Sequence, residues 1–539
     1  MQKPLWWQTG TIYQVYPRSF QDTNGDGVGD LRGIRERLPH LVELGVDALW
    51  ISPIFASPMA DFGYDISDYC AIDPLFGSMD DFDALLEAAH AHGLKLLLDL
   101  VPNHTSDQHA WFKESRSSRD NPMRDFYIWR DPKPDGGLPT NWQSEFGGSA
   151  WEFDEATGQY YYHAFLPQQP DLNWRNTRVR HAMYDVMRFW LRKGVDGFRV
   201  DVIWHLLKDD QFRDNPINPD YREGMPPHRR VIPLHTADLP DVHAIINSLR
   251  RVVDEFPERL LIGEIYLPIE KLVTYYGRDL EGAHLPFNFT LLETEWRARA
   301  IAKLIDEYEG AIPDGGWPNW VLGNHDRPRI VGRVGTAQAR IAAMLLLTLR
   351  GTPTIYYGDE IGMPDVPIPP DRVQDPFEKR VPGIGVGRDG ARTPMQWDAS
   401  SHAGFSTVEP WLPLAETWKS DNLENDRRDP TSIYALHRRL IAVRRERRVL
   451  QLGSYRPVVA QGELLLYVRH LGEDRVLVAL NLGGDAAALT FPGGGLRGTV
   501  LVSSFADREG ERLTGDIDLR GDEGLVIELD KDAVVPEAV

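Results

Sequence analysis

Eight short apolar runs, separated by amphipathic helical patterns, restrict the fold of this chain more than any other feature of its sequence. The runs are almost continuously apolar, as parallel strands buried on both faces are. They are Thr11–Tyr16, Val46–Ser52, Leu94–Val101, Val195–Val202, Leu260–Ile265, His284–Phe289, Trp320–Asn324 and Thr352–Tyr357. Helical patterns lie between them, for example at Leu31–Leu44, Asp80–His92, Arg178–Arg192 and Val242–Phe256. Eight such units in order predict an α/β fold of the (β/α)8 TIM barrel type; a doubly wound sheet is the alternative but usually has fewer strands.

Two stretches depart from a plain barrel. A long segment rich in Gly, Pro and Trp follows the third strand. After Ser454 the helical pattern gives way to alternating strand patterns at Leu464–Val468, Val476–Leu480, Thr499–Val502 and Leu525–Leu529. We therefore expect a catalytic barrel made of residues 1–101 and 174–454, an inserted domain at 102–173, and a small C-terminal antiparallel β domain at 455–539.

Charge and cysteine content narrow the class of partner. The formal net charge of the 539 residues is −21, and such a surface repels nucleic acid and anionic membranes but leaves a neutral substrate unaffected. The single cysteine, Cys70, permits no intrachain disulfide. We see no signal-peptide pattern at the N-terminus and no membrane-length apolar run, so we expect a cytoplasmic protein. The oligomeric state stays open between a monomer and a small homo-oligomer.

Carboxylates follow four of the predicted strands at the edge where barrel enzymes carry their chemistry. The third strand ends in DLVPNH, the fourth in DGFRVDV, the fifth in GEI and the seventh in NHD, which contribute Asp99, Asn103, His104, Arg199, Asp201, Glu264, His325 and Asp326. A helix cap or a turn could account for any one of these carboxylates alone. Burying several is costly unless they are paired or functional, so the set as a whole indicates a catalytic site.

Glycoside hydrolysis is the reaction that uses such a set. One carboxylate attacks the anomeric carbon, and a second, kept protonated by its surroundings, protonates the leaving oxygen. Arg199 stands two residues before Asp201 on one strand, so the two share a face, and its charge would keep Asp201 ionised. His104 and His325 can donate to hydroxyls of a neutral sugar.

Taken in order, DLVPNH, DGFRVDV, GEI and NHD resemble the signature regions of the α-amylase family of glycoside hydrolases. Further segments, QVYPRSFQDTNGDGVGD, DFGYDISDY, FGGSAW, QQPDLNW and RTPMQWD, are similar to its α-glucosidase branch, which includes oligo-1,6-glucosidases. The resemblance covers essentially the whole chain. It implies a barrel with a domain inserted after strand three, a C-terminal β domain, and a retaining mechanism.

The resemblance also implies roles for individual residues. Asp201 would be the nucleophile, Glu264 the acid/base and Asp326 the third carboxylate. The substrate-binding set would be Asp61, Tyr64, His104, Arg199 and His325, together with Phe146, Phe165, Val202 and one of Arg388 and Arg392, between which the sequence does not choose. Phe146 and Phe165 fit core packing of the insert equally well. Valine after the nucleophile resembles the 1,6-specific members, although it would also suit the end of a buried strand.

The segment DTNGDGVGD is a second signal. Oxygen-bearing residues fall at positions 1, 3, 5 and 9, as at the start of an EF-hand loop, but Gly33 stands where that loop has its final glutamate. An Asp/Gly-rich turn is the alternative. The resemblance favours a structural Ca²⁺ held by Asp22, Asn24, Asp26, the Val28 carbonyl and Asp30.

These signals together predict an exo-acting, retaining α-glucosidase that acts on short α-1,4- or α-1,6-linked oligosaccharides. A glucosyl transferase of the same fold shares the covalent intermediate and stays open as an alternative. A non-catalytic barrel that only binds sugar is the alternative of another class, but such a protein would be expected to have lost catalytic carboxylates, and all three candidates are present.

Overall fold

The computed structural model describes residues 3–489 and 496–534. At its centre lies an eight-stranded parallel sheet in the order β11-β10-β9-β5-β2-β1-β13-β12. The strands are β1 Ile12–Val15, β2 Ala48–Ile51, β5 Lys95–Leu100, β9 Gly197–Val200, β10 Leu260–Ile265, β11 Leu285–Asn288, β12 Asn319–Val321 and β13 Thr352–Tyr356. Each overlaps one of the eight predicted runs, so the predicted barrel is confirmed.

The strands at the two ends of this order are β11 and β12, and a side chain joins them and closes the barrel. Asn319 of β12 accepts a hydrogen bond from the backbone N–H of Asn288 at 2.9 Å, and its amide donates to the carbonyl of Pro286 at 2.5 Å. The asparagine amide thus supplies the donor and the acceptor that a backbone ladder would supply.

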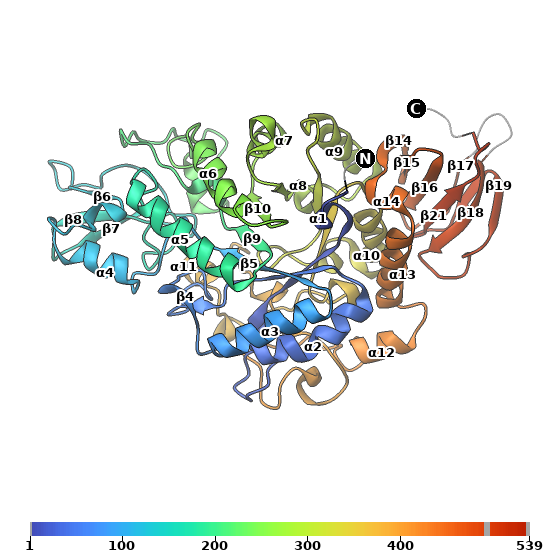
Figure 1. Cartoon of the computed structure of the whole chain (residues 1–539), viewed down its shortest axis with the longest axis horizontal. Helices are drawn as coiled ribbons and strands as arrows, with labels where there is room; N and C mark the ends of the chain where they lie inside the picture. The colour runs from blue at the N-terminus through green and yellow to red at the C-terminus, as the bar shows by residue number, and fades with distance from the viewer. Residues whose placement is uncertain (1–2, 490–495, 535–539) are drawn as a thin grey trace.

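Helices surround the strands (Figure 1). The long ones are α2 Leu31–Leu44, α3 Met79–Ala91, α5 Thr177–Lys193, α6 Val242–Asp254, α9 Ala298–Ala311, α10 Ile330–Thr348 and α13 Ile433–Glu446. Shorter ones are α1 Trp6–Thr9, α7 Ile269–Leu272, α8 Thr290–Glu293, α11 Pro376–Arg380, α12 Leu423–Arg428 and α14 Arg448–Leu452. The four helical patterns named from sequence agree with α2, α3, α5 and α6 to within two residues at each end.

Capping residues explain why these helices begin and end where they do. Asp30 accepts the backbone N–H of Gly33 at the start of α2, and Gly45 ends that helix in the left-handed conformation. Asn176 and Gly194 do the same for α5. Short polar side chains satisfy free N–H groups at the first turn, and glycine tolerates the positive φ of the last one.

The insert lies between the end of β5 and the start of α5, as predicted. It contains α4 Ala110–Ser117 and a small antiparallel sheet of β6 Trp129–Arg130, β8 Gln159–Tyr162 and β7 Trp151–Asp154. Trp142 and Trp151 stack in its core with ring centroids 5.7 Å apart. A separate pair of strands, β3 Phe55–Ala56 and β4 Asp68–Ile72, follows β2. Figure 1 shows the insert at one end of the long axis and the C-terminal sheet at the other.

The C-terminal domain is a six-stranded antiparallel sheet in the order β14-β15-β16-β21-β18-β19, with a two-stranded sheet of β17 and β20. Their bounds are β14 Ser454–Gln461, β15 Leu464–Leu471, β16 Asp474–Asn481, β17 Ala487–Leu489, β18 Leu496–Ser503, β19 Arg512–Gly515, β20 Ile517–Leu519 and β21 Gly524–Leu529. The sequence predicted β15, β16, β18 and β21. The edge strands β14 and β19 carry charged and partly exposed residues and gave no apolar alternation.

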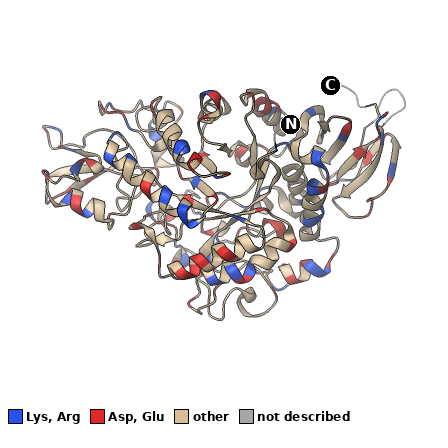
Figure 2. Ribbon diagram, viewed as in Figure 1, with Lys and Arg blue, Asp and Glu red and all other residues tan. Residues whose placement is uncertain are grey.

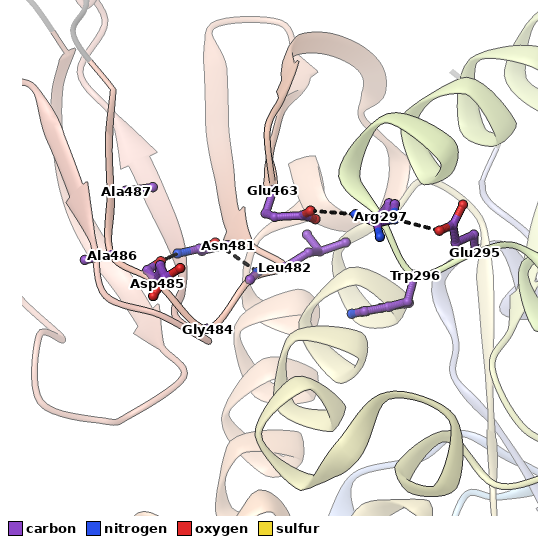
Figure 3. A pocket seen from close by; sticks show the side chains of 11 residues that line it. Glu295, Trp296, Arg297, Glu463, Asn481, Leu482, Gly484, Asp485, Ala486 and Ala487 are labelled. Atoms are coloured by element: carbon purple, nitrogen blue, oxygen red, sulfur yellow. Dashed lines mark hydrogen bonds and ion pairs between the residues drawn. The ribbon is translucent and has the colours of Figure 1, made fainter.

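Two buried arginines lie where this domain meets the barrel, and the second of them, Arg469, spans the junction. Arg444 of α13 donates to the carbonyls of Leu347, Leu349, Leu450 and Gly351, and Arg469 of β15 donates to those of Thr348, Leu450 and Gly453. At the rim of the same junction, Arg297 links Glu295 to Glu463 beside a crevice of about 540 Å³ (Figure 3).

Basic and acidic residues both occur along the outer helix α2, whereas the charged residues of α3 in the same colouring are all acidic (Figure 2). Among the described residues, α10 alone is long and apolar enough to span a bilayer by composition. Ala339 and all of its residues from Ile341 to Thr348 are buried, and the Thr348 hydroxyl lies against the Tyr467 hydroxyl of the C-terminal domain at 2.5 Å. It is a core helix of this fold.

Candidate active site

Five carboxylates meet at the ends of the barrel strands, and we call them the carboxylate cluster. Asp99 ends β5, Asp201 follows β9, Glu264 lies near the end of β10, Asp326 follows β12, and Asp61 comes from the β3–β4 connection. All but Asp326, whose side chain is 24% exposed, are almost fully buried. The predicted catalytic set is therefore brought together, and solvent reaches it on the Asp326 side.

Gly197 allows the neighbouring strands β9 and β10 to approach each other closely. It starts β9 with φ 150°, and a Cβ there would lie 2.1 Å from the carbonyl oxygen of Leu260 on β10. Only glycine fits such a contact with a neighbouring backbone. The close pairing of β9 and β10 brings their ends, and hence Asp201 and Glu264, side by side.

Arg199 lies at the centre of the carboxylate cluster. Its Nη1 donates to Asp99 Oδ1 at 2.7 Å and to Asp201 Oδ1 at 2.9 Å, and its Nη2 lies 2.8 Å from Glu264 Oε2. The guanidinium is fully buried. The sequence led us to expect that its charge would keep Asp201 ionised; instead the charge is shared among three carboxylates, and it does not outweigh the effects of burial and of Glu264 on Asp201.

Asp201 and Glu264 form a coupled acid pair. Burial, and then the neighbouring Glu264, raise the pKa of Asp201 well above its usual value. Burial also raises the pKa of Glu264, although Arg199 opposes the rise. Two buried carboxylates that share one cation cannot both ionise cheaply, so the pair retains a proton into a higher pH range than either residue would alone. One attacking carboxylate and one proton donor can therefore coexist here.

Val202 has an unusual backbone conformation. Its φ of 38° and ψ of 47° lie in the left-handed region, which disfavours β-branched residues, and it stands outside β9, which ends at Val200. Its backbone N–H donates to Glu264 Oε2 at 2.9 Å. The reading of Val202 as the last residue of a buried strand is therefore wrong. Its conformation therefore makes Oε2 of Glu264 an acceptor.

Both candidate arginines contact Asp326. Arg392 Nη2 lies 2.8 Å and Arg388 Nη1 3.2 Å from Asp326 Oδ1, and Arg388 Nη2 also donates to Asp61 Oδ1 at 2.9 Å. The choice that the sequence left open thus resolves to both. Although burial acts to raise the pKa of Asp326, His325, Arg388 and Arg392 together hold it far below its usual value. Asp326 is therefore ionised and can only accept hydrogen bonds.

His325 and Tyr64 form a stacked pair beside Asp326. Their rings lie 5.5 Å apart and almost parallel, with Tyr64 Oη 2.7 Å from His325 Nε2. Burial lowers the pKa of His325 to about 3, so the ring is neutral. Because Gln14 Nε2 donates to its Nδ1 at 2.8 Å, we assign the proton to Nε2, which faces Tyr64 and Asp326.

His104 belongs to the same side of the site as Asp61. Its Nε2 lies 3.1 Å from the Tyr64 carbonyl, and burial lowers its pKa to about 3. The amide of Gln169, which comes from the insert, donates to Asp61 Oδ2 at 3.2 Å and lies equally close to His104 Nε2. This side combines carboxyl acceptors, amide donors and neutral histidines, which is the chemistry that recognises sugar hydroxyls.

Phe146 and Phe165 both come from the insert and face the barrel. Phe165 packs on His104 at 5.2 Å, and Phe146 lies under the Arg388 guanidinium at 5.0 Å and stacks on Phe377 at 5.0 Å. They therefore form part of the boundary between the insert and the site, as members of the predicted substrate-binding set would, and they also pack on each other at 5.6 Å.

Two contributors were not predicted. Gln169 stands in the quoted segment QQPDLNW, where its neighbours Pro170 and Asp171 could have drawn attention to it. Asp375, which contacts Arg388, lies in a loop with no strand end or motif to mark it. Neither could be found by looking for carboxylates at strand ends.

The predicted calcium loop is a compact turn. Asp22 accepts N–H bonds from Asn24, Gly25 and Gly27 and the Ser406 hydroxyl, while Asp30 accepts from Thr23 and from Gly33. Asn24 and Asp26 lie together at its outer side, 3.1 Å apart. Within residues 3–489 and 496–534, no group of three His, Cys, Asp or Glu side chains is arranged to hold a metal. The oxygens of Asn24 and Asp26 also accept hydrogen bonds from within the loop, from the Asp26 and Val28 N–H groups and from the Asn24 amide, so calcium stays a prediction.

Comparison with known proteins defines the class. The family model described as the catalytic domain of alpha amylase matches residues 14–453, the barrel with its insert. The chain belongs to the α-amylase family of glycoside hydrolases.

Its relatives narrow this further. The chain is 41% identical to a probable alpha-glucosidase of Rhizobium meliloti, over 94% of this chain and 95% of that one, and 40% identical to an oligo-1,6-glucosidase of Heyndrickxia coagulans, over 90% and 94%. A solved structure of an alpha-glucosyl transfer enzyme, XgtA, superposes with a TM-score of 0.92 at 40% identity, covering 98% of this chain and 100% of that one. The chain is an enzyme of the α-glucosidase type.

Proposed function

We propose that this enzyme is a retaining, exo-acting α-glucosidase that removes terminal glucose from short α-1,4- or α-1,6-linked oligosaccharides. The observation that carries the proposal is the pair of Asp201 and Glu264, which share one buried guanidinium. Retaining glycosidases need their two carboxylates close together, whereas inverting ones need room for a water between them.

In the first step, Asp201 attacks the anomeric carbon and the glycosidic C–O bond breaks. Glu264 gives its proton to the departing oxygen, so a covalent glucosyl ester of Asp201 and a free alcohol result. The ionised Asp326 accepts hydrogen bonds from hydroxyls of the reacting ring and favours its distorted form, which the resemblance to the family also assigns to it.

In the second step, Glu264, now ionised, takes a proton from water as the water attacks the ester. Glucose leaves and Asp201 is free again. A second sugar could attack in place of water, and the structural similarity to an alpha-glucosyl transfer enzyme supports this glucosyl transfer as the alternative outcome. Both outcomes use the same residues up to the intermediate.

The outer side of the site supports the proposal of exo action. Asp61, Tyr64, His104 and Gln169 are joined by hydrogen bonds, and the insert covers them through Phe146 and Phe165. A site closed there accepts a chain end and rejects a chain interior. We propose neutral oligosaccharides as the only substrates, and a cytoplasmic location, which the single cysteine supports.

Product analysis tests the proposal. Maltose, isomaltose, sucrose and trehalose are incubated with the enzyme at low and high concentration, and products are followed over time. Glucose should appear first, with longer products growing only at high substrate. Early oligosaccharides from soluble starch would indicate an open cleft, and transfer products that dominate even in dilute substrate would favour the transferase.

A further inference from the structure

Asp375 is a buried carboxylate that contacts neither the nucleophile nor the acid. It lies in the long connection between β13 and α13, is 0% exposed, and meets Arg388. We propose that Asp375 is a positioning residue that holds Arg388 between Asp61 and Asp326. The proposal rests on the proposed function, in which these two carboxylates bind the terminal glucose.

The Asp375 carboxylate binds the edge of the Arg388 guanidinium formed by Nε and Nη2. Asp375 Oδ1 accepts from Nη2 at 2.7 Å and from Nε at 3.2 Å, while Oδ2 accepts from the backbone N–H at 2.7 Å and from Nε at 3.1 Å. A carboxylate that takes the Nε–Nη2 edge fixes the plane of a guanidinium. The remaining hydrogens on Nη1 and Nη2 then point at Asp326 and Asp61, which lie at 3.2 and 2.9 Å.

Without Asp375, nothing among these contacts would fix the plane of the Arg388 guanidinium. An arginine side chain has many rotamers, and two acceptors on different chain segments would leave it free to favour one. If Arg388 moved toward Asp61, Asp326 would keep only its contact with Arg392 among the two arginines. If Arg388 moved toward Asp326, Asp61 would lose its hydrogen bond from Arg388. Either shift moves an acceptor that the terminal glucose must meet.

The same segment also touches the insert. Phe377, two residues on, stacks on Phe146 at 5.0 Å, and Arg380 donates to the Gly147 carbonyl at 3.0 Å. Asp375 therefore fixes Arg388 in a frame shared by the insert and the β13–α13 connection. Asp375 thus helps to keep the charged groups of the glucose site in place relative to the insert.

Asp375 has a second, purely structural task, which the test must separate. Its Oδ1 caps α11 by accepting the N–H of Phe377 at 3.1 Å. Serine is a good helix cap, but its short side chain cannot reach the guanidinium edge. Asp375→Ser therefore keeps the cap and removes the grip, while Asp375→Asn keeps the volume and removes the charge. Asp371→Ser, at an exposed aspartate in the same connection, is the matched control.

We measure KM and kcat on isomaltose and the inhibition constant of glucose for wild type, D375S, D375N, R388A and D375S/R388A. D375S should raise KM and the glucose constant together by about tenfold or more, as the loss of charge-assisted bonds predicts, with a smaller change in kcat. D371S should match wild type.

The double variant decides whether Asp375 acts through Arg388 or independently of it. If Asp375 acts through Arg388, D375S/R388A is no worse than R388A. Additive losses, or D375S and D375N with wild-type KM and glucose constants, would overturn the inference. If D375S does not fold, D375N and its double variant with R388A carry the same comparison. Failure of the proposed function is distinct, because the wild type itself would then release no glucose.

Discussion

At the scale of single residues, one buried guanidinium serves three acids. Arg199 touches Asp99, Asp201 and Glu264, so the charge of any one of them depends on the other two. Substituting one carboxylate then changes both its own role and the proton affinity of its neighbours. Effects of single substitutions here will not add.

Asp201→Asn should abolish nearly all hydrolysis while the fold persists. Loss of a nucleophile costs several orders of magnitude in rate, and asparagine can keep the hydrogen bond from Arg199. Asp210→Asn, at an exposed neighbour on the same connection, is the control and should keep full activity. Circular dichroism confirms that the variant is folded. If the folded variant retained a tenth of the wild-type hydrolysis rate, Asp201 would be excluded as the nucleophile.

Glu264→Gln should discriminate between leaving groups. A nitrophenyl glucoside leaves with little protonation, whereas isomaltose needs the proton that Glu264 supplies. The pre-steady-state glycosylation rate should therefore fall far more with isomaltose than with the nitrophenyl substrate. Equal losses would contradict the role of proton donor.

Val202 offers a test of linkage preference. It follows the nucleophile, donates to the acid and takes a left-handed conformation, so its side chain is held in one place beside the reacting pair. A change of one methyl to a hydroxyl can shift selectivity by roughly 1–3 kcal/mol. We expect good acceptance of α-1,6 bonds and a lower isomaltose-to-maltose ratio of kcat/KM in Val202→Thr. A wild type that strongly prefers maltose, with no change in the variant, would show that Val202 does not set the linkage.

At the scale of elements, the sequence predicted what periodicity and strand ends can reveal. All eight barrel strands and the carboxylates at their ends were found, because buried parallel strands are continuously apolar and catalytic groups gather at one edge. Asp375 was missed because its partner, Arg388, is set by the tertiary fold of an irregular connection. The conformation of Val202 was missed for a related reason: valine after an apolar run is typical of a strand, and the hydrogen bond from its N–H to Glu264 is a tertiary contact that the sequence does not show.

The loop from Asp22 to Asp30 makes a testable element of its own. If it binds calcium, the ion stabilises the native state by mass action, so a chelator should lower the melting temperature and calcium should restore it. Asp26→Asn keeps the acceptor that bonds the Val28 N–H at 2.8 Å but lowers the charge, and should make the protein insensitive to chelation. An unchanged melting temperature in wild type, with no metal in the purified protein, would leave the loop a turn.

At the scale of the whole molecule, buried neutral histidines make stability depend on pH. Burial lowers the pKa of His104 and His325 to about 3 and that of His109 and His163 to about 4, from 6.5. Below 6.5 the unfolded chain binds protons that the native protein does not, so stability falls as pH falls through this window. Each such histidine contributes up to about 1.4 kcal/mol per pH unit.

Urea unfolding at several pH values between about 7 and about 5 measures this slope. His109→Asn is the informative variant, because asparagine can keep the cap on the Trp111 N–H that starts α4 while removing one titrating group. Its slope should be shallower than that of wild type. His92→Asn, at an exposed histidine, should leave the slope unchanged, and equal slopes in all three proteins would contradict the explanation.

The hydrogen bonds of Arg469 across the junction of barrel and terminal sheet limit how this chain can be divided. Arg469 comes from the C-terminal sheet, yet it satisfies the carbonyl of Thr348 at the end of a barrel helix and that of Leu450. A shortened gene product ending at residue 453 would remove the donor of the Thr348 carbonyl and expose the apolar side of α10 together. The terminal sheet is thus no detachable accessory. In a recombined or domain-shuffled enzyme, the barrel and its sheet would have to be inherited as one piece.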